Sequence, residues 1–400
     1  MTVVGRTAAI RTVDEALADC AAGRPGTLLV DGPTGSGKSD LLHTVVEQAT
    51  AIGALVLHAV GTPTGRGTPL DLLHRLLVSD RTGALGALEP STADCLLRWD
   101  AALRQLSRTT PVVLCVDDVQ YADRASLTVL RYLARPARSG RFLLVLAGTG
   151  DLPRIPGARQ VRLELLTPVE VAELAGDTDR AVFLHGASGG NPLLLRALLA
   201  RPDTFALAVG ACLHRCGPTA AAVAQAAAVL GTSTTPDRVA LLLGTTPTSA
   251  RQGLAVLTAA GLADGTTLRP QAVRAAVLTT LGPPRLADLH RRAALALHRT
   301  GAPASQAADH LLAAAARTPD PWPATPAEVD LLCEAATPDD GVHALRLLEL
   351  AHRLCPDTQQ RKVIAARLAR LLWQFNPAAA ERLISARLTT AQSAGAGARS

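Results

Sequence analysis

The sequence predicts an α/β region with a parallel five-stranded sheet over residues 1–165, followed by helical segments up to residue 400. Two observations predict this order. Short apolar runs alternate with helical patterns up to about residue 165, and β-like runs nearly vanish from Thr167 onward. A chain of 400 residues exceeds what a single core usually organises, so several domains in series are expected.

Five apolar runs are predicted to be the strands of the sheet. Each is bounded by Gly, Pro or charged residues, and each is apolar without alternation, which is typical of parallel strands covered on both faces. The predicted strands span residues 27–31, 54–60, 112–117, 142–148 and 160–165.

Three helical domains are predicted after the sheet. Residues 166–216 are predicted to form a helical lid. Its first helix is predicted to begin at Thr167, Pro168 and Glu170, which supply an N-cap, a first-turn proline and an acid at the third position. Residues 217–282 read as a winged-helix-like domain, and residues 283–400 as an arm of helical hairpins, similar to tetratricopeptide repeats, with a frayed C-terminus.

The winged-helix prediction depends on a short pattern inside residues 217–282. Helices are predicted at 237–243 and 248–260, joined by a turn and followed by a hairpin. In the arm, His290, His298 and His310 are predicted to lie on exposed helix faces.

Composition limits the class of protein. The 40 basic and 34 acidic residues give a net charge of +6 without a basic run, which is a weak indication of nucleic-acid binding. No apolar stretch approaches the roughly 20 residues of a spanning helix, so no membrane association is expected. The seven dispersed cysteines and the absence of a signal peptide predict a cytoplasmic protein. Cys212 and Cys216 have no second pair at ligand spacing, and they are predicted to be buried thiols on a helix.

A phosphate-binding loop follows the first predicted strand. The run from Gly32 to Ser39 matches G-x-x-x-x-G-K-[ST] and precedes a predicted helix that starts near Asp40. Its amide groups are expected to surround phosphates at the positive end of that helix. The predicted ATP or ADP contacts are Gly32, Pro33, Thr34, Gly35, Ser36, Gly37, Lys38, Ser39 and Asp40.

Two carboxylates end the third predicted strand, where they face the same edge of the sheet as the loop. Asp117 is predicted to bind Mg²⁺ together with the Ser39 hydroxyl. Asp118 is predicted to orient or deprotonate an attacking water, and Lys38 to reach the β and γ phosphates. Lys38, Asp117 and Asp118 are therefore the candidate catalytic residues of a P-loop NTPase fold.

Several segments of the sequence resemble those of a known protein family. The run Asp117–Asp118–Val–Gln–Tyr–Ala–Asp123 is similar to a segment of the large LuxR-type ATP-binding bacterial regulators, which are AAA-like P-loop proteins of the STAND class. The Val4–Gly5–Arg6 start and the Gly190–Asn191–Pro192 helix start are also similar. The resemblance implies that Gly5 and Arg6 lie near the adenine and that Pro192 contacts the base. It covers roughly residues 3–315.

The resemblance implies a switch rather than a metabolic enzyme. ADP would hold a closed state, and an unknown inducer or protein partner on the helical arm would allow exchange for ATP, with nucleotide-dependent self-assembly as one output. Slow ATP hydrolysis is also expected. The chain stops before the DNA-binding domain of such regulators, so DNA binding is not expected without a further domain.

Some positions depart from the family. Pro270 stands where a histidine would contact the ADP phosphate, the segment Thr149–Gly150 lacks an arginine, and Thr7 and Tyr121 replace Glu and Trp. Nucleotide binding is therefore better supported than hydrolysis. Three alternatives stay open: a P-loop kinase for a small molecule, a regulator whose helix 248–260 reads DNA, and a scaffold that has lost nucleotide binding.

Overall fold

The structure is a computed structural model that describes residues 6–80, 82, 83, 85, 95–135, 140–150, 152–200, 202–269, 271–318, 322–337 and 341–375. Its compact units are residues 1–216 with 256–263, and residues 217–255 with 264–400. None of the helices in the described part is long and apolar enough to cross a membrane. The predicted fold class is confirmed: a five-stranded parallel sheet of the P-loop type is followed by helices.

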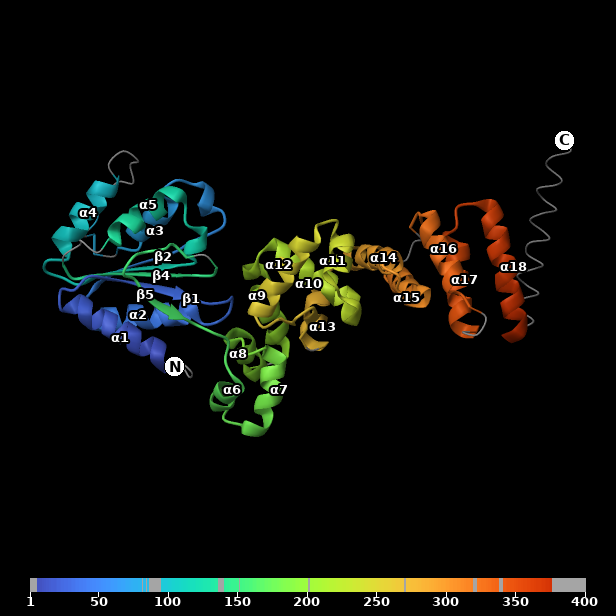
Figure 1. Ribbon diagram of the computed structural model, residues 1–400, viewed down its shortest axis with the longest axis horizontal. Coiled ribbons are helices and arrows are strands. Elements are labelled where there is room, and N and C mark those ends of the chain that lie inside the picture. The colour runs from blue at the N-terminus through green and yellow to red at the C-terminus, as the bar shows by residue number, and fades with distance from the viewer. Residues whose placement is uncertain are drawn as a thin grey trace. The chain divides into compact units, whose positions relative to one another are not determined.

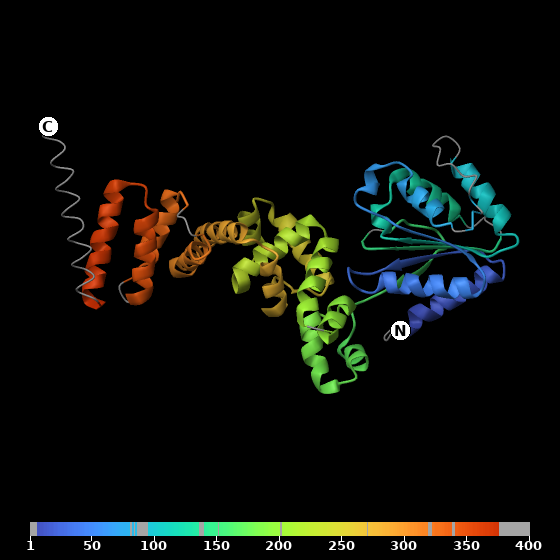
Figure 2. The same ribbon diagram turned by 180° about the vertical axis from the view of Figure 1, so that it is seen from behind.

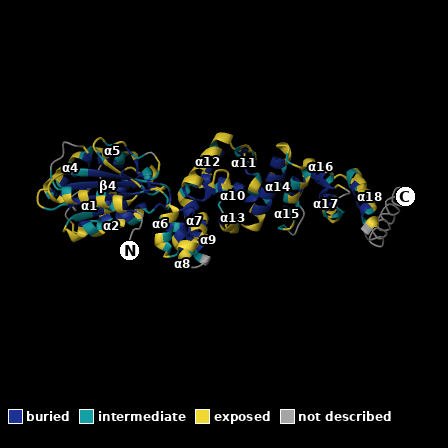
Figure 3. Cartoon of the chain, turned by 60° about the horizontal axis from the view of Figure 1, so that its bottom comes forward, coloured by how far each residue is buried: buried dark blue, intermediate teal, exposed yellow. Residues whose placement is uncertain are grey.

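The sheet has the strand order β2-β3-β4-β1-β5, and its paired strands are parallel. Because alternate side chains of a strand point to opposite faces, β3 places Val113 and Cys115 in one core and Leu114 and Val116 in the other. β4 is buried along its whole length (Figure 3). The strands are β1 (Gly26–Asp31), β2 (Leu55–Val60), β3 (Val112–Asp117), β4 (Phe142–Gly148) and β5 (Arg159–Arg162).

Helices cover both faces of the sheet, as the unbroken apolar runs predict. α1 (Thr7–Ala21) and α2 (Lys38–Ala51) lie on one face (Figure 1). The opposite face carries α3 (Asp71–Val78), α4 (Cys95–Leu106) and α5 (Arg124–Leu133), as the reverse view also shows (Figure 2).

The fifth strand is shorter than predicted. It ends at Arg162 instead of residue 165, and only Val161 of its four residues is buried. β5 is an edge strand that pairs with β1 alone, so neither burial nor a second neighbour extends it. Leu163 still donates its amide to the carbonyl of Asp31, at 2.7 Å, before the chain leaves the sheet.

Four helices follow the sheet in the first unit. The predicted cap of the first is present: Thr167 accepts the amide of Glu170 at 3.3 Å, and the Glu170 carboxylate accepts the amide of Thr167 at 2.7 Å. The helices are α6 (Pro168–Ala175), α7 (Thr178–Ser188), α8 (Pro192–Ala200) and α9 (Pro202–Cys216). On α9, Cys212 is buried as predicted, whereas Cys216 is only half-buried.

The two helices predicted at 237–243 and 248–260 lie within a residue of those bounds, and a hairpin follows them. α10 (Pro218–Leu230) is followed by α11 (Pro236–Leu243), α12 (Pro247–Ala259) and the strands β6 (Ala263–Asp264) and β7 (Thr267–Leu268). Their assignment as a winged-helix domain stays a prediction, as do the other domain limits. The remaining helices are α13 (Gln271–Thr279), α14 (Pro283–Arg299), α15 (Ala304–Ala315), α16 (Pro326–Ala335), α17 (Gly341–Leu354) and α18 (Thr358–Phe375).

Two of the three histidines predicted to be exposed are not. His290 is buried between α14 and α15, and its Nδ1 lies 2.9 Å from Nδ1 of His310, while His298 is exposed as predicted. Helical spacing predicted that both histidines would be exposed. This was wrong because α15 covers a face of α14 that carries polar as well as apolar residues. Burial, with contributions from His310, Arg317 and Arg274, lowers the pKa of His290 to about 4.

This pair predicts acid sensitivity. An unfolded histidine titrates near 6.5, so between about pH 6.5 and 4 the unfolded state binds a proton that folded His290 does not bind. The contribution of the neutral His290 side chain to the free energy of unfolding is fully present above pH 6.5. About 3 kcal/mol of it is expected to be lost as the pH falls from 6.5 to 4. Thermal unfolding followed by circular dichroism should show a shallower pH dependence for His290→Leu than for the natural chain. His298→Gln serves as the control, and parallel pH profiles for all three proteins would contradict the assignment.

Candidate nucleotide-binding site

The loop between β1 and α2 requires its glycines. Gly35 and Gly37 have φ angles of 81° and 95°, in the left-handed region that favours glycine. A Cβ on Gly32 would lie 2.5 Å from the carbonyl oxygen of Leu163, and one on Gly35 would lie 2.5 Å from the Asn191 side chain. α2 begins at Lys38, so the amides of its first turn lack partners within the helix and favour an anion.

Lys38 lies inside this loop. Its Nζ donates to the carbonyl oxygens of Gly32 and Pro33, at 2.8 and 2.9 Å, and the residue is 7% exposed. Burial lowers the pKa of Lys38, and the carboxylates of Asp118 and Asp117 oppose that shift. The loop therefore holds a cation that is partly desolvated, which strengthens its attraction for a phosphate.

Ser39 and Asp117 meet as the sequence predicts. The Ser39 hydroxyl donates to Oδ2 of Asp117 at 2.6 Å, and Oδ1 of Asp117 accepts the amide of Asp118 at 2.8 Å. The hydroxyl comes from the first turn of α2 and the carboxylate from the end of β3. A hydroxyl and a carboxylate at this separation are hard oxygen ligands of the kind that Mg²⁺ prefers, so this pair fits the predicted metal.

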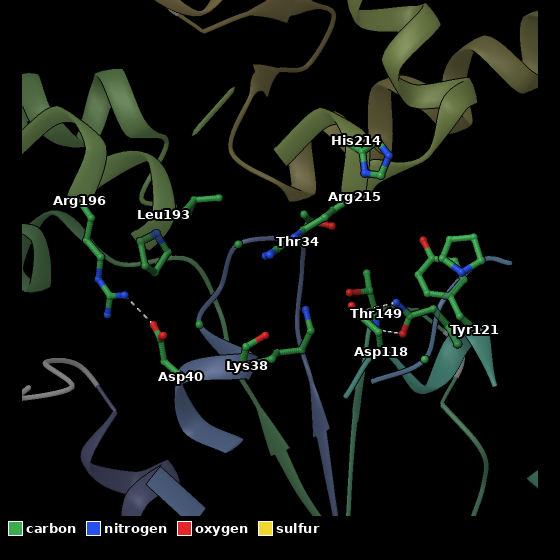
Figure 4. A pocket seen from close by; sticks show the side chains of 17 residues that line it. Thr34, Lys38, Asp40, Asp118, Tyr121, Thr149, Leu193, Arg196, His214 and Arg215 are labelled. Atoms are coloured by element: carbon green, nitrogen blue, oxygen red, sulfur yellow. Dashed lines mark hydrogen bonds and ion pairs between the residues drawn. The ribbon is translucent and has the colours of Figure 1, made fainter. Parts of the chain in front are cut away.

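Gln120 connects the second carboxylate to the end of β4. Its Nε2 donates to Oδ1 of Asp118 at 2.9 Å, and its Oε1 accepts the amide of Thr149 at 3.1 Å. The Thr149 hydroxyl donates in turn to the carbonyl of Gly32, at 3.2 Å. Figure 4 shows Asp118 and Thr149 joined through this amide side chain. Sequence reasoning assigned no role to Gln120, although it lies within the run that carries the family resemblance.

A pocket of about 360 Å³ lies over the loop, and helices of the same unit complete its wall. Arg196 of α8 bonds Oδ2 of Asp40 at 2.8 Å (Figure 4). The pocket is lined by Thr34, Gly35, Gly37, Lys38, Ser39, Asp40, Gly61, Pro63, Asp118, Gln120, Tyr121, Thr149, Pro192, Leu193, Arg196, His214 and Arg215. Arg196, His214 and Arg215 were not predicted, since no local pattern distinguishes them from other polar residues on helices.

Some predicted contacts lie behind the pocket wall. Arg6 is buried and donates to the carbonyls of Ser36 and Glu164, both at 2.7 Å, so it supports the loop from below. Gly32, Pro33 and Ser36 do not line the pocket either. Gly5 and Pro270 lie outside the described residues.

Asn191 joins the loop to the helices. Its Nδ2 donates to the carbonyls of Thr34 and Ala260, at 3.0 and 2.8 Å. Its Oδ1 accepts the amides of Leu193 and Leu194, at 3.0 and 3.4 Å, and so caps α8. The residue is fully buried. One side chain therefore fixes the position of Pro192 and its helix relative to the phosphate-binding loop.

The loop, the two aspartates and the strands that carry them belong to a segment with a recognisable family pattern. Residues 2–146 match the AAA ATPase domain. The matched segment includes Lys38, Ser39, Asp117 and Asp118, and it ends within β4. The AAA ATPase family implies nucleotide binding, typically with Mg²⁺. No curated protein sequence is significantly similar to the chain.

Three solved structures resemble the chain at low identity. A STAND protein with a tetratricopeptide repeat sensor from Pyrococcus horikoshii is 15% identical, with a TM-score of 0.34, over 93% of this chain and 63% of that one. Cdc6p from Pyrobaculum aerophilum is 16% identical, with a TM-score of 0.39, over 69% of this chain and 93% of that one. A structure of the Drosophila origin recognition complex bound to DNA is 16% identical, with a TM-score of 0.39, over 69% of this chain and 86% of that one. The chain thus spans less than two thirds of the STAND protein's length, and these likenesses assign no function.

Proposed function

We propose that the chain binds ATP and ADP with Mg²⁺ and acts as a nucleotide-dependent switch of the STAND type, related to the LuxR-type regulators. One observation carries the proposal. The pocket is lined both by the phosphate-binding loop and by α8 and α9, and Asn191 and Arg196 connect the two parts. A ligand in this pocket would therefore be sensitive to the position of the helices.

The chain's own residues have separable tasks in this proposal. The loop amides and Lys38 would bind the phosphates, and Ser39 and Asp117 would hold the metal. When bound, Mg²⁺ neutralises charge on the phosphate oxygens. Asp118, held by Gln120, would orient a water for slow hydrolysis. Pro192 and Leu193 offer an apolar surface for the base.

The switch depends on differential binding, since a ligand shifts a conformational equilibrium only by binding one state more tightly. Arg196 and Arg215 are the cations that the helices contribute to the pocket. Arg196 is engaged with Asp40, so a change in the phosphates near α2 would be expected to change this ion pair. A partner on the helical arm and self-assembly in the ATP state remain parts of the same proposal.

Hydrolysis in this site is proposed to be slow. Thr149 stands at the end of β4, where the family resemblance implies a nearby arginine, and its hydroxyl is bonded to the loop. An arginine near a γ-phosphate can accelerate hydrolysis by orders of magnitude. Turnover is therefore expected to be slow, as suits a switch.

The nucleotide that co-purifies with the full chain tests this function. We expect ADP in the purified protein, and a rise in molar mass by light scattering after exchange for ATP with Mg²⁺. Protein that is free of nucleotide and that turns ATP over rapidly would point to an ordinary enzyme. ATP-dependent phosphorylation of a small molecule, far above the background ATPase rate, would support the kinase alternative instead.

A further inference from the structure

Two neighbouring hollows on the α/β region form a groove, which we call the arginine trough. α5 lies along one side and residues 152–156, after β4, along the other. The hollows measure about 760 and 400 Å³, and they share Arg131 and Arg154. Arg66 of the short helix η1 (Gly65–Gly67) lies in one hollow and Leu96 of α4 in the other. The lining residues from α4 and α5 place the trough on the sheet face that carries these helices. Figure 1 shows α4 and α5 on that face.

The trough is basic throughout. Arg66, Arg131, Arg135 and Arg154 line it and are exposed, and no Asp or Glu is among the described residues of its wall. Arg66, Arg131 and Arg154 form no ion pair with any residue in the described part of the chain. Some exposed arginines elsewhere in the unit, Arg75 and Arg104 among them, have carboxylate partners. Several uncompensated guanidinium groups in one groove favour a ligand with several negative charges.

Aromatic rings line the same hollows as these arginines. The chain has two tyrosines, Tyr121 and Tyr132, and both line the trough. The guanidinium of Arg135 lies 4.5 Å from the centre of the Tyr132 ring. On α5, Leu127 and Arg131 are four residues apart, so one helix face presents apolar surface and charge together, and Arg135 follows just after the helix ends.

We propose that the arginine trough binds single-stranded nucleic acid, with Arg131 and Arg154 on the phosphates and a base against the Tyr132 ring. Arginine forks match phosphate oxygens, and bases of a single strand stack on aromatic side chains. In a duplex the bases are already stacked and paired with each other, so they are not free to stack on these rings. An acidic peptide would pair with the guanidinium groups but would leave the rings unused. The residues of the trough include none from α12, the helix that the sequence predicts as a candidate for reading duplex DNA.

The test is fluorescence anisotropy of a labelled oligothymidylate with the full chain, at several salt concentrations. The double variant that carries Arg131→Gln and Arg154→Gln is expected to bind the oligothymidylate about tenfold more weakly, or weaker still. The same pair should reduce the slope of log affinity against log salt by about 1.4, since each phosphate contact on a single strand contributes about 0.7. Tyr132→Leu should weaken binding without changing the salt slope, because stacking carries no charge.

Arg124→Gln is the matched control, because it removes the same charge from α5 at an exposed position outside the trough. It should leave affinity within about twofold. Circular dichroism checks that each variant is folded. The proposal is overturned if the chain does not bind the oligomer at low salt, if Arg124→Gln has the effect of the trough variants, or if a duplex or poly-glutamate binds as tightly as the single strand.

Discussion

Lys38→Ala is expected to lower the affinity for ADP and ATP by about a hundredfold, or ~3 kcal/mol. The Lys38 ammonium is the cation held within the phosphate-binding loop, 2.8 Å from the carbonyl of Gly32, and its side chain is buried. Removing a buried charge that would bond phosphate oxygens costs more than removing an exposed one, because water screens the exposed charge. Isothermal titration with Mg²⁺ and ADP measures the loss.

The chain provides its own control for this experiment. Lys362 on α18 is the second of two lysines, and Lys362→Ala removes the same functional group away from the pocket. It should bind ADP like the natural chain. Lys38→Met, which retains the length of the side chain, separates lost charge from lost volume in the loop. An unchanged affinity in Lys38→Ala, with the fold intact by circular dichroism, would refute the proposed site.

Local patterns predicted the part of the site that lies within single segments. The loop from Gly32 to Ser39 needs its glycines for backbone reasons that are visible in the sequence, and the buried run of β3 places Asp117 at the sheet edge. The meeting of Ser39 with Asp117 followed from parallel strands alone, since their carboxyl ends share one edge. Prediction succeeded here because backbone conformation and strand direction decide the geometry.

The features that the sequence did not predict, or predicted wrongly, depend on packing between distant segments. Arg196 and Arg215 reach the pocket because α8 and α9 lie over the loop, and nothing in their own turns marks them. The resemblance implies that Arg6 lies near the adenine, which stays a prediction; the bond that Arg6 donates to the loop carbonyl of Ser36 was not foreseen. His290 has the spacing of an exposed residue and is buried by α15. Helical periodicity fixes which residues share a face, but not which neighbour covers that face.

Asn191→Ala is expected to have the second large effect, on both stability and nucleotide affinity. It removes the cap of α8, worth about 1 kcal/mol, and leaves the buried carbonyls of Thr34 and Ala260 without a donor, at about 1–3 kcal/mol each. A loss of about 3 kcal/mol or more in unfolding free energy is therefore expected. Urea unfolding measures it, and faster hydrogen exchange at the amides of Leu193 and Leu194 would locate it.

Asn191→Ser separates the two tasks of this side chain. A serine hydroxyl can still cap α8, but it is too short to reach the carbonyl of Thr34. The serine variant should recover the capping part of the stability and the slow exchange of α8, while its affinity for ADP stays reduced, because the loop is no longer tied to the helices. Thr325→Ala, which removes a comparable cap from α16, should lower stability without changing the affinity. If serine restores full affinity, the bonds from Asn191 to the loop do not shape the pocket, and the coupling between loop and helices must depend on Arg196 and Asp40 instead.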